Sequence, residues 1–280
     1  MLNVLCVGVA TLDIVNGVDA YPAEDSEVRA IGQCRRTGGN AANTAMALAM
    51  LGNRVSWVGN LARPAPTAEQ DFANHGVDVS LASRVAEVEM PTSYVLLSAA
   101  TGTRSIVHFR NMPEYPSDDF ARLDLAGFDW IHFEGRAVDQ LGPMLAHARA
   151  VSGAAISLEV EKPREGIEAL FPHADLLLFS RGYAEAKGHA DAIGLLESLA
   201  DSVPATCTWG AEGAWARAPD GSLTHVPAPA IGAVVDTLGA GDVFNAGMIH
   251  ALGGGQSLVA AVHEAVGLAS AKCTREGLAW

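Results

Sequence analysis

The segment Asp236-Thr-Leu-Gly-Ala-Gly-Asp242 places two aspartates and two glycines directly before an apolar stretch. A tight turn of small residues, here Gly239–Gly241, lets successive backbone N–H groups point into one concavity, and a following helix N-terminus adds about half a positive charge. Such a turn can bind an anion without a lysine. Asp242 would lie in the first helical turn, where an aspartate can either accept a proton or simply cap the helix. The segment alone leaves both roles open.

Common motifs for phosphate binding and nucleophilic catalysis do not account for this segment. A Walker A loop requires Gly-Lys before Ser or Thr, and the sequence contains no Gly-Lys pair. A dinucleotide-binding fingerprint requires a third glycine where Phe244 stands, and it follows the first strand of a domain. A Gly-x-Ser-x-Gly nucleophile motif is absent from the sequence. What remains is a short glycine turn that leads into an apolar helix.

The composition excludes several classes of partner. Only 18 residues are basic and the formal net charge is −14, whereas nucleic acids and anionic membranes require basic patches. The N-terminal Met1–Gly8 has no charged region, and no apolar run reaches the about 18–20 residues of a membrane span, so we expect neither a signal peptide nor a transmembrane helix. The four cysteines are far apart, which favours reduced thiols in a cytoplasmic protein.

Short apolar runs alternate with helical patterns along most of the chain. The 280 residues, 49% of them hydrophobic, predict a single α/β domain over residues 1–280. Continuous apolar strands separated by helices predict a three-layer α/β/α core with a mostly parallel sheet. The predicted strands are Leu2–Val9, Val55–Gly59, Trp130–Phe133, Ala155–Val160, Asp175–Phe179 and Ala205–Trp209. The predicted helices are Ala41–Leu51, Asp139–Val151, Ala190–Leu199, Ala240–Ala251 and Leu258–Ala271.

Two segments, about residues 11–37 and 86–110, interrupt this alternation. They contain short β-like pieces without an intervening helix, such as Thr92–Ser98 and Ser105–Phe109, and Thr101-Gly102 suits a hairpin turn between these two. They predict a small antiparallel β appendage over one end of the main sheet. Surface hairpins without a function fit the pattern equally well.

The glycine segment resembles the C-terminal signature of the PfkB/ribokinase-like carbohydrate kinases. A second segment, Gly38-Gly-Asn-Ala-Ala-Asn43 followed by a helix to Leu51-Gly52, resembles the N-terminal signature of the same family. The signatures stand in the family's order, and the resemblance covers essentially the whole chain. It implies a ribokinase-like fold in which the β appendage is a lid. It also implies transfer of the γ-phosphoryl group of ATP, with Mg²⁺, to a hydroxyl group.

Further segments resemble the ketohexokinases, the fructose 1-kinases of this family. These segments are Leu12-Asp13, Tyr21–Glu27, Ala100–Arg104, Trp130–Arg136 and Ser157–Glu165. Many family members carry an Asn-x-x-Glu motif where this sequence has Ser180-Arg-Gly-Tyr183, and the ketohexokinases depart from the motif there too. The departure leaves open which carboxylate organises Mg²⁺. The resemblance also implies a homodimer joined through the lids.

The resemblance assigns roles in phosphoryl transfer to the C-terminal signature. Asp242 is implied to be the base beside the attacking hydroxyl, and the amides of Gly239, Ala240 and Gly241 are implied to form the anion hole. We expect the helix N-terminus to lower the pKa of Asp242, so that its carboxylate mainly orients the hydroxyl. Arg104, in the predicted lid, could clamp the phosphates from above, although an ordinary exposed arginine is the alternative.

Sugar binding is implied for residues near the N-terminal signature. Asp13, Gly39, Asn40 and Asn43 match the family's sugar-binding positions, and Asp25 is implied to reach a sugar site in either the same or the partner subunit. Two asparagines three positions apart on one helix face can bracket a polyol. Without the resemblance, Asp13 could merely end a strand and Asn40 could merely cap a helix.

The nucleotide base is expected beside the small-residue turn after the strand that ends at Trp209. The candidate contacts are Trp209, Gly210, Gly213, Pro229, Gly239 and Gly241. The strand-like spacing of Trp209 also fits a core position. Asp236 is a candidate ligand of a monovalent cation such as K⁺. Glu159, with Glu161, could help to hold Mg²⁺ through bound water, although a charged sheet edge fits these two residues equally well.

Three functions therefore remain open. The leading interpretation is an ATP-dependent ketohexose kinase that converts D-fructose to fructose 1-phosphate. A related kinase for ribose, another sugar, 2-keto-3-deoxygluconate or a nucleoside is the first alternative, since a few lid side chains can redirect specificity. The second is a sugar-binding protein without kinase activity, and the presence of Asp242 with both glycines argues against it.

Overall fold

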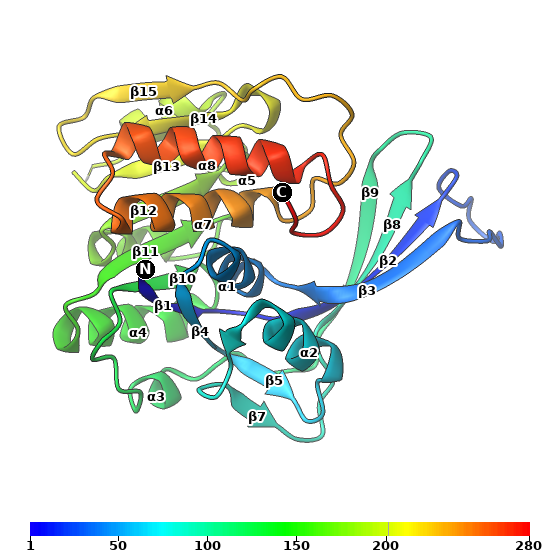
Figure 1. Ribbon diagram of the computed structural model, residues 1–280, viewed down its shortest axis with the longest axis horizontal. Coiled ribbons are helices and arrows are strands. Elements are labelled where there is room, and N and C mark those ends of the chain that lie inside the picture. The colour runs from blue at the N-terminus through cyan, green and yellow to red at the C-terminus, as the bar shows by residue number, and fades with distance from the viewer. Residues whose placement is uncertain (201) are drawn as a thin grey trace.

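The computed structural model describes residues 1–200 and 202–280, and it has the three-layer α/β/α arrangement that the sequence predicts (Figure 1). Among these residues, one nine-stranded sheet has the order β15-β14-β13-β12-β11-β10-β1-β4-β6. All pairs from β6 to β13 are parallel, and only the β13-β14-β15 edge is antiparallel. The strands are β1 (Asn3–Val7), β4 (Arg54–Val58), β6 (Val77–Asp78), β10 (Trp130–Glu134), β11 (Ala155–Val160), β12 (Leu176–Ser180), β13 (Ala205–Thr208), β14 (Ala214–Arg217) and β15 (Leu223–Val226).

Helices cover both faces of this sheet because successive strand residues point to opposite sides. In β1, Val4 and Cys6 belong to one apolar core, together with residues of α1 (Asn40–Met50), α2 (Pro66–His75), α7 (Ala240–Gly253) and α8 (Leu258–Lys272). Leu5 and Val7 belong to a second core, on the opposite face, with residues of α3 (Ser117–Phe120), α4 (Val138–Val151), α5 (Arg181–Ala186) and α6 (Ala192–Ser198). None of the described helices is long and apolar enough to cross a bilayer.

The β appendage is confirmed as a separate four-stranded sheet that projects from the core (Figure 1). Its order is β3-β2-β8-β9, formed by β2 (Thr11–Val18), β3 (Gly32–Gly38), β8 (Thr92–Ser98) and β9 (Arg104–Phe109). The pairs β2-β3 and β8-β9 are antiparallel, and a parallel β2-β8 pair joins them. We call this sheet the lid. A small pair of strands, β5 (Asn60–Ala62) and β7 (Ser83–Val85), forms a separate two-stranded sheet.

The N-terminal signature connects the lid to the core through two glycines. A Cβ atom on Gly38 would lie 2.1 Å from Oδ2 of Asp13, and one on Gly39 would lie 2.3 Å from the carbonyl oxygen of Val9. Gly39 also has a φ of 97°, which L side chains rarely adopt. Both glycines are therefore required where β3 passes into α1, and this passage brings the start of α1 close to the carboxyl end of β1.

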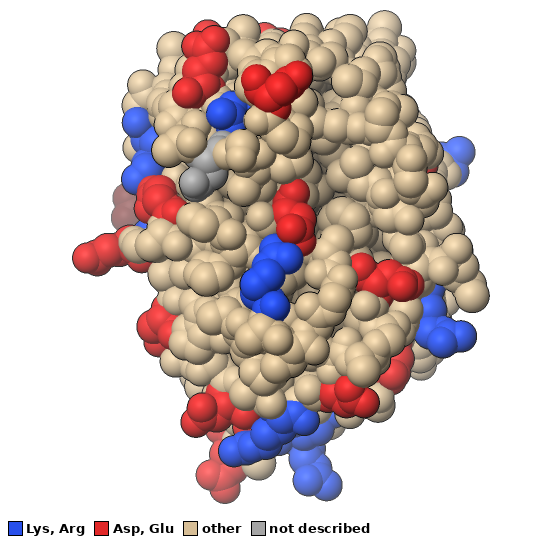
Figure 2. Space-filling model, turned by 90° about the vertical axis from the view of Figure 1, so that its left-hand side faces the viewer, with Lys and Arg blue, Asp and Glu red and all other residues tan. Residues whose placement is uncertain are grey.

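The face of the molecule opposite the lid carries charged side chains of both signs. Lysine and arginine side chains are interspersed with carboxylates there (Figure 2). The four cysteines are free thiols; Cys6 and Cys207 are buried in the two cores.

Candidate active site

A polar cavity of about 670 Å³ lies between the core and the lid, beside the carboxyl ends of the parallel strands. In open α/β sheets this edge is where ligands bind. The cavity brings together most of the residues that the sequence singled out. Those that line it are Asp13, Gly39, Asn40, Asn43, Arg104, Glu159, Glu161, Gly239, Gly241 and Asp242.

Asp242 is the buried acid at the floor of this cavity. It lies in the first turn of α7 and is 7% exposed. Asn43, on the adjacent helix α1, donates a hydrogen bond from Nδ2 to Oδ2 of Asp242 at 2.7 Å. Thr44 of α1 donates to the carbonyl oxygen of Asp242 at 3.4 Å. The two signatures therefore meet through a direct contact that fixes the carboxyl group of Asp242.

The expectation that the helix N-terminus lowers the pKa of Asp242 is wrong. The pKa of this carboxyl is raised to about 8, and burial is the largest cause. The hydrogen bond from Asn43 acts in the opposite direction, whereas the charges of Glu161, Glu134 and Asp13 contribute to the increase. Loss of hydration and nearby negative charge thus outweigh the helix dipole, whose effect is typically below about 1 kcal/mol.

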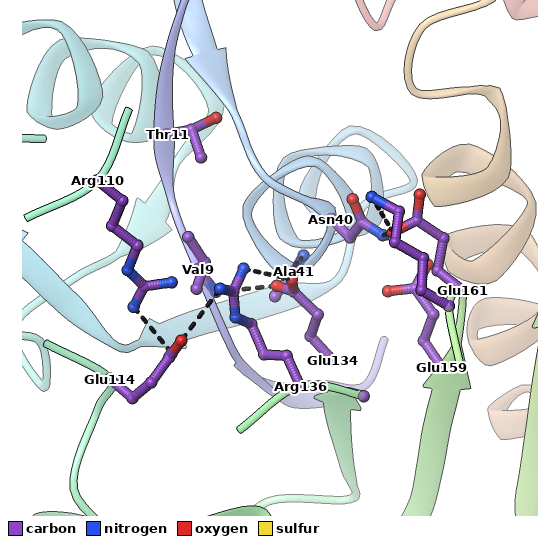
Figure 3. A network of polar contacts seen from close by, with 12 residues as sticks. Val9, Thr11, Asn40, Ala41, Arg110, Glu114, Glu134, Arg136, Glu159 and Glu161 are labelled. Atoms are coloured by element: carbon purple, nitrogen blue, oxygen red, sulfur yellow. Dashed lines mark hydrogen bonds and ion pairs between the residues drawn. The ribbon is translucent and has the colours of Figure 1, made fainter. Parts of the chain in front are cut away.

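Glu159 is a second buried carboxyl group beside the first turn of α1 (Figure 3). Its Oε1 accepts hydrogen bonds from Nδ2 of Asn40 at 3.1 Å and Nδ2 of Asn245 at 3.0 Å. Its Oε2 is buried without a hydrogen-bond partner. Burial raises the pKa of Glu159, and the nearby carboxylates, Asp242 first among them, raise it further. An unpaired buried carboxylate oxygen at a cavity is suited to a cation.

Glu134 is a site residue to which the sequence analysis gave no role. It ends β10, and its Oε2 accepts hydrogen bonds from the backbone N–H groups of Val9 at 2.9 Å and Ala41 at 3.4 Å (Figure 3). Arg136 lies 3.6 Å from its Oε1 and also pairs with Glu114, as does Arg110. The available signal was the position of a carboxylate at the carboxyl end of a predicted parallel strand.

The glycine turn has the geometry of an anion-binding site. Gly239 has a left-handed φ of 86° and precedes α7. The first N–H groups of a helix have no partner within it, although that of Ala240 donates to the carbonyl oxygen of Thr237 at 3.3 Å. From the lid, Nη1 of Arg104 donates to Oγ1 of Thr237 at 2.9 Å. The guanidinium of Arg104 therefore lies against the turn.

A second cavity, of about 610 Å³, adjoins the first at this turn. The two share Arg104, Thr208, Thr237 and Gly241 in their linings. The second lining is mostly apolar and includes Gly210, Gly213, Pro229, Ile231, Phe244 and Ala269. A polar compartment and an apolar compartment thus meet at the anion-binding turn.

Three predicted site residues lie elsewhere. Trp209 is 6% exposed and packs in the core, with the guanidinium of Arg181 at 5.3 Å from its ring, so it does not line the apolar cavity. Asp25 is exposed in the loop between β2 and β3 and does not line the polar cavity of its own chain. Asp236 is hydrogen-bonded to cationic side chains of the protein rather than open to a metal ion.

Few carboxylates in the polar cavity are available as ligands of a divalent cation. Among the described residues, no cluster of three or more His, Cys, Asp or Glu side chains is arranged to hold a metal ion. Mg²⁺ is commonly held by one or two carboxylates, water and substrate phosphates. Glu159, with its unpaired oxygen, and the neighbouring Glu161 fit that arrangement.

Residues 1–279 match the model of the pfkB family carbohydrate kinases. The chain belongs to this family. The carbohydrate kinase is 36% identical to ketohexokinase of Mus musculus over 290 residues, which covers 98% of this chain and 97% of the relative. Its fold is similar to a candidate ribokinase from Agrobacterium tumefaciens (TM-score 0.86, 26% identity, 99% and 92% coverage). It is also similar to a ribokinase from Cryptococcus neoformans var. grubii in complex with ADP (TM-score 0.82, 21% identity, 99% and 95% coverage). The protein is therefore an enzyme, a phosphotransferase with an alcohol group as acceptor.

Proposed function

We propose that this carbohydrate kinase transfers the γ-phosphoryl group of ATP to a ketohexose, converting D-fructose to fructose 1-phosphate. The observation that carries the proposal is the junction of a polar and an apolar cavity at the glycine turn, directly beside the buried Asp242. A sugar and a nucleotide bound on the two sides of this turn would present the hydroxyl and the γ-phosphoryl to each other. The 36% identity to ketohexokinase supports a ketohexose as acceptor.

The polar cavity supplies hydrogen-bonding groups for a polyol from the lid and from α1. Asp13 is held by a hydrogen bond from Oγ1 of Thr11 at 2.8 Å, and Asn40 and Asn43 are fixed by contacts to Glu159 and Asp242. A rigid set of acceptors and donors rejects sugars that leave one of them unpaired. These residues, with Gly39, are the proposed sugar-binding set.

Phosphoryl transfer needs positioning, charge stabilisation and an acceptor for the hydroxyl proton. In the proposed step, the sugar oxygen bonds to the γ-phosphorus, the bond to the leaving oxygen of ADP breaks, and the hydroxyl proton passes to the carboxylate of Asp242. The N–H groups of Gly239–Gly241 and the guanidinium of Arg104 stabilise the transferring phosphoryl. Glu159 and Glu161 are the proposed carboxylates for Mg²⁺, which when bound would supply positive charge to the phosphates and would favour the ionised form of Asp242.

The apolar cavity is the proposed site of the nucleotide base. Gly210 leaves room for a planar ring, because a Cβ atom there would have no neighbour within 4 Å, and Pro229 and Ala269 line the same cavity. The backbone at Gly213 is close-packed, because a Cβ atom there would lie 2.1 Å from the carbonyl oxygen of Val226.

The lid, formed by residues 11–37 and 86–110, is the proposed homodimer interface. In β9, Arg104, Ile106 and His108 line the polar cavity, so the residues between them point to the opposite face of the lid. That outer face exposes Tyr94, Val107 and Phe109 to solvent. Pairing of two lids would cover this apolar face and would carry Asp25 toward the partner's sugar site.

The proposal is tested by measuring ADP release in the presence of ATP and Mg²⁺. The acceptors are D-fructose, D-tagatose, D-ribose, 2-keto-3-deoxygluconate and adenosine. We expect the highest kcat/KM with D-fructose. A preference for D-ribose would favour the function named for the structural relatives. Binding of a sugar without ADP release from any acceptor would instead indicate a non-catalytic sugar-binding protein.

A further inference from the structure

A buried lysine lies behind the anion-binding turn. The side chain of Lys272, at the C-terminus of α8, is 0% exposed. Its Nζ donates to the carbonyl oxygen of Asp236 at 2.5 Å and lies 3.5 Å from Oδ2 of the same residue. Lysines are almost never fully buried without a partner, because removing an ammonium group from water is costly. The contacts with Asp236 supply the partner that this buried ammonium group requires.

The carboxylate of Asp236 is fully engaged by groups of the protein. Its Oδ2 accepts hydrogen bonds from Nη1 and Nη2 of Arg36, both at 3.1 Å, and from the N–H of Gly277 at 3.2 Å. Its Oδ1 accepts from the N–H of Leu238 at 2.8 Å. Burial opposes ionisation of Asp236, but these hydrogen bonds and the two cations lower its pKa overall. The monovalent cation that the sequence suggested does not fit here, because both carboxylate oxygens of Asp236 already accept hydrogen bonds from the protein.

The same residues tie the end of α8 to the start of the turn. The carbonyl oxygen of Cys273 accepts hydrogen bonds from the N–H groups of Val235 at 2.8 Å and Asp236 at 3.3 Å. The next residue after Asp236 is Thr237, which Arg104 contacts. Gly239, which begins the proposed anion hole, follows two residues later. The position of Asp236 thus fixes where the N–H groups of the turn point.

We propose that Lys272 is a positioning residue that acts as a built-in monovalent cation. Its ammonium group holds Asp236, and through it the anion-binding turn, in the arrangement that binds the phosphates of the nucleotide. The kinase therefore does not depend on K⁺ or another external monovalent cation. The inference rests on the proposed binding of ATP at this turn, and it does not depend on which sugar is phosphorylated.

The first test uses the unmodified protein. ADP binding is measured by calorimetry with the chloride salts of K⁺, Na⁺ and tetramethylammonium at equal ionic strength, and kcat is measured with the preferred acceptor in the same salts. We expect both quantities to agree within about twofold between the salts, because Lys272 already supplies the cation that holds the turn, whereas a displaced turn would cost up to about 100-fold. Tenfold or stronger dependence on K⁺ would overturn the proposal. An absence of turnover with every acceptor, together with salt-independent ADP binding, would refute the proposed function and leave this inference standing.

The second test removes the ammonium group. We expect Lys272→Met to weaken ADP binding and to lower kcat by about 10–100-fold in tetramethylammonium chloride, whereas Lys272→Arg keeps most of both. Lys187→Met is the matched control, because Lys187 is a partly exposed lysine that pairs with Glu168. Folding of each variant is checked by thermal unfolding. Unchanged ADP binding and kcat in folded Lys272→Met would overturn the proposal. If Lys272→Met does not fold, the salt dependence of Lys272→Arg decides: independence supports a built-in cation, and K⁺ dependence contradicts it.

Discussion

Replacing the carboxyl group of Asp242 should make the kinase more stable and nearly inactive. Asp242→Asn keeps the shape of the side chain and an oxygen that can accept the hydrogen bond from Asn43. It removes the group that we propose accepts the hydroxyl proton, and general-base contributions are typically about 10²–10⁴-fold. We therefore expect kcat to fall by about that factor, while the protein remains folded.

The stability gain follows from the raised pKa of Asp242. Burial raises this pKa from 3.8 to about 8, so between these values the native state binds its proton more tightly than the unfolded state. The free energy of unfolding then falls as the pH rises, by at most about 1.4 kcal/mol per pH unit for one proton. Because the pKa of Glu159 is raised in the same surroundings, part of this slope belongs to Glu159. We expect Asp242→Asn to be more stable than the wild type by about 2–4 kcal/mol at pH 7.

The comparison requires the free energy of unfolding of both proteins in urea, without ligands, from pH 4 to pH 8. The stability advantage of Asp242→Asn should be small at pH 4 and should grow with pH, and kcat is measured on the same preparations. If the variant has no stability advantage at pH 8, the argument that burial and neighbouring carboxylates raise the pKa of Asp242 is refuted. Near-normal kcat would refute its assignment as the base.

Three further substitutions separate the parts of the site. Arg104→Gln should lower kcat/KM by about 10–100-fold, since charge-assisted contacts to a phosphate are strong, and should leave thermal unfolding unchanged. Substitution of the exposed Arg122 by Gln is the control. Equal activity of the two variants would exclude a phosphate contact of Arg104. Ala269→Phe should fill the apolar cavity and raise KM for ATP by about tenfold or more, leaving KM for the sugar unchanged; a rise in the sugar KM alone would reverse the assignment of the two cavities. Val107 is 70% exposed on the outer face of the lid and should be covered in the homodimer. Val107→Glu should therefore give monomers, measured by light scattering. A monomeric wild type, or a variant that stays dimeric, would exclude this interface.

Much of the fold could be predicted from the sequence because its local patterns agree with its tertiary structure. The continuous apolar run of β1 occupies a strand buried on both faces, and the apolar helix after Gly241 packs against α1 in the core. The sequence assigned both signatures to one proposed site, and in the structure the hydrogen bond between Asn43 and Asp242 joins them.

The properties that failed to follow from the sequence depend on side chains that converge from distant segments. The pKa of Asp242 is raised because carboxylates from β2, β10 and the end of β11 surround it, and no local spacing encodes that crowding. Trp209 is excluded from the apolar cavity by its place in the core. Asp236 precedes α7 and Lys272 ends α8, so the two residues that pair in the structure are far apart in the sequence. The sequence therefore offered only an isolated lysine and an isolated aspartate.

The most direct test of the central claim is the identity of the product. The kinase is incubated with ATP, Mg²⁺ and D-fructose labelled with ¹³C at C1, and the product is examined by NMR. The account predicts an ATP-dependent product whose C1 signal is split by phosphorus, and Asp242→Asn should form it far more slowly. A phosphate on another carbon, or no ATP-dependent product from D-fructose while another acceptor is phosphorylated, would contradict the proposed ketohexose 1-kinase.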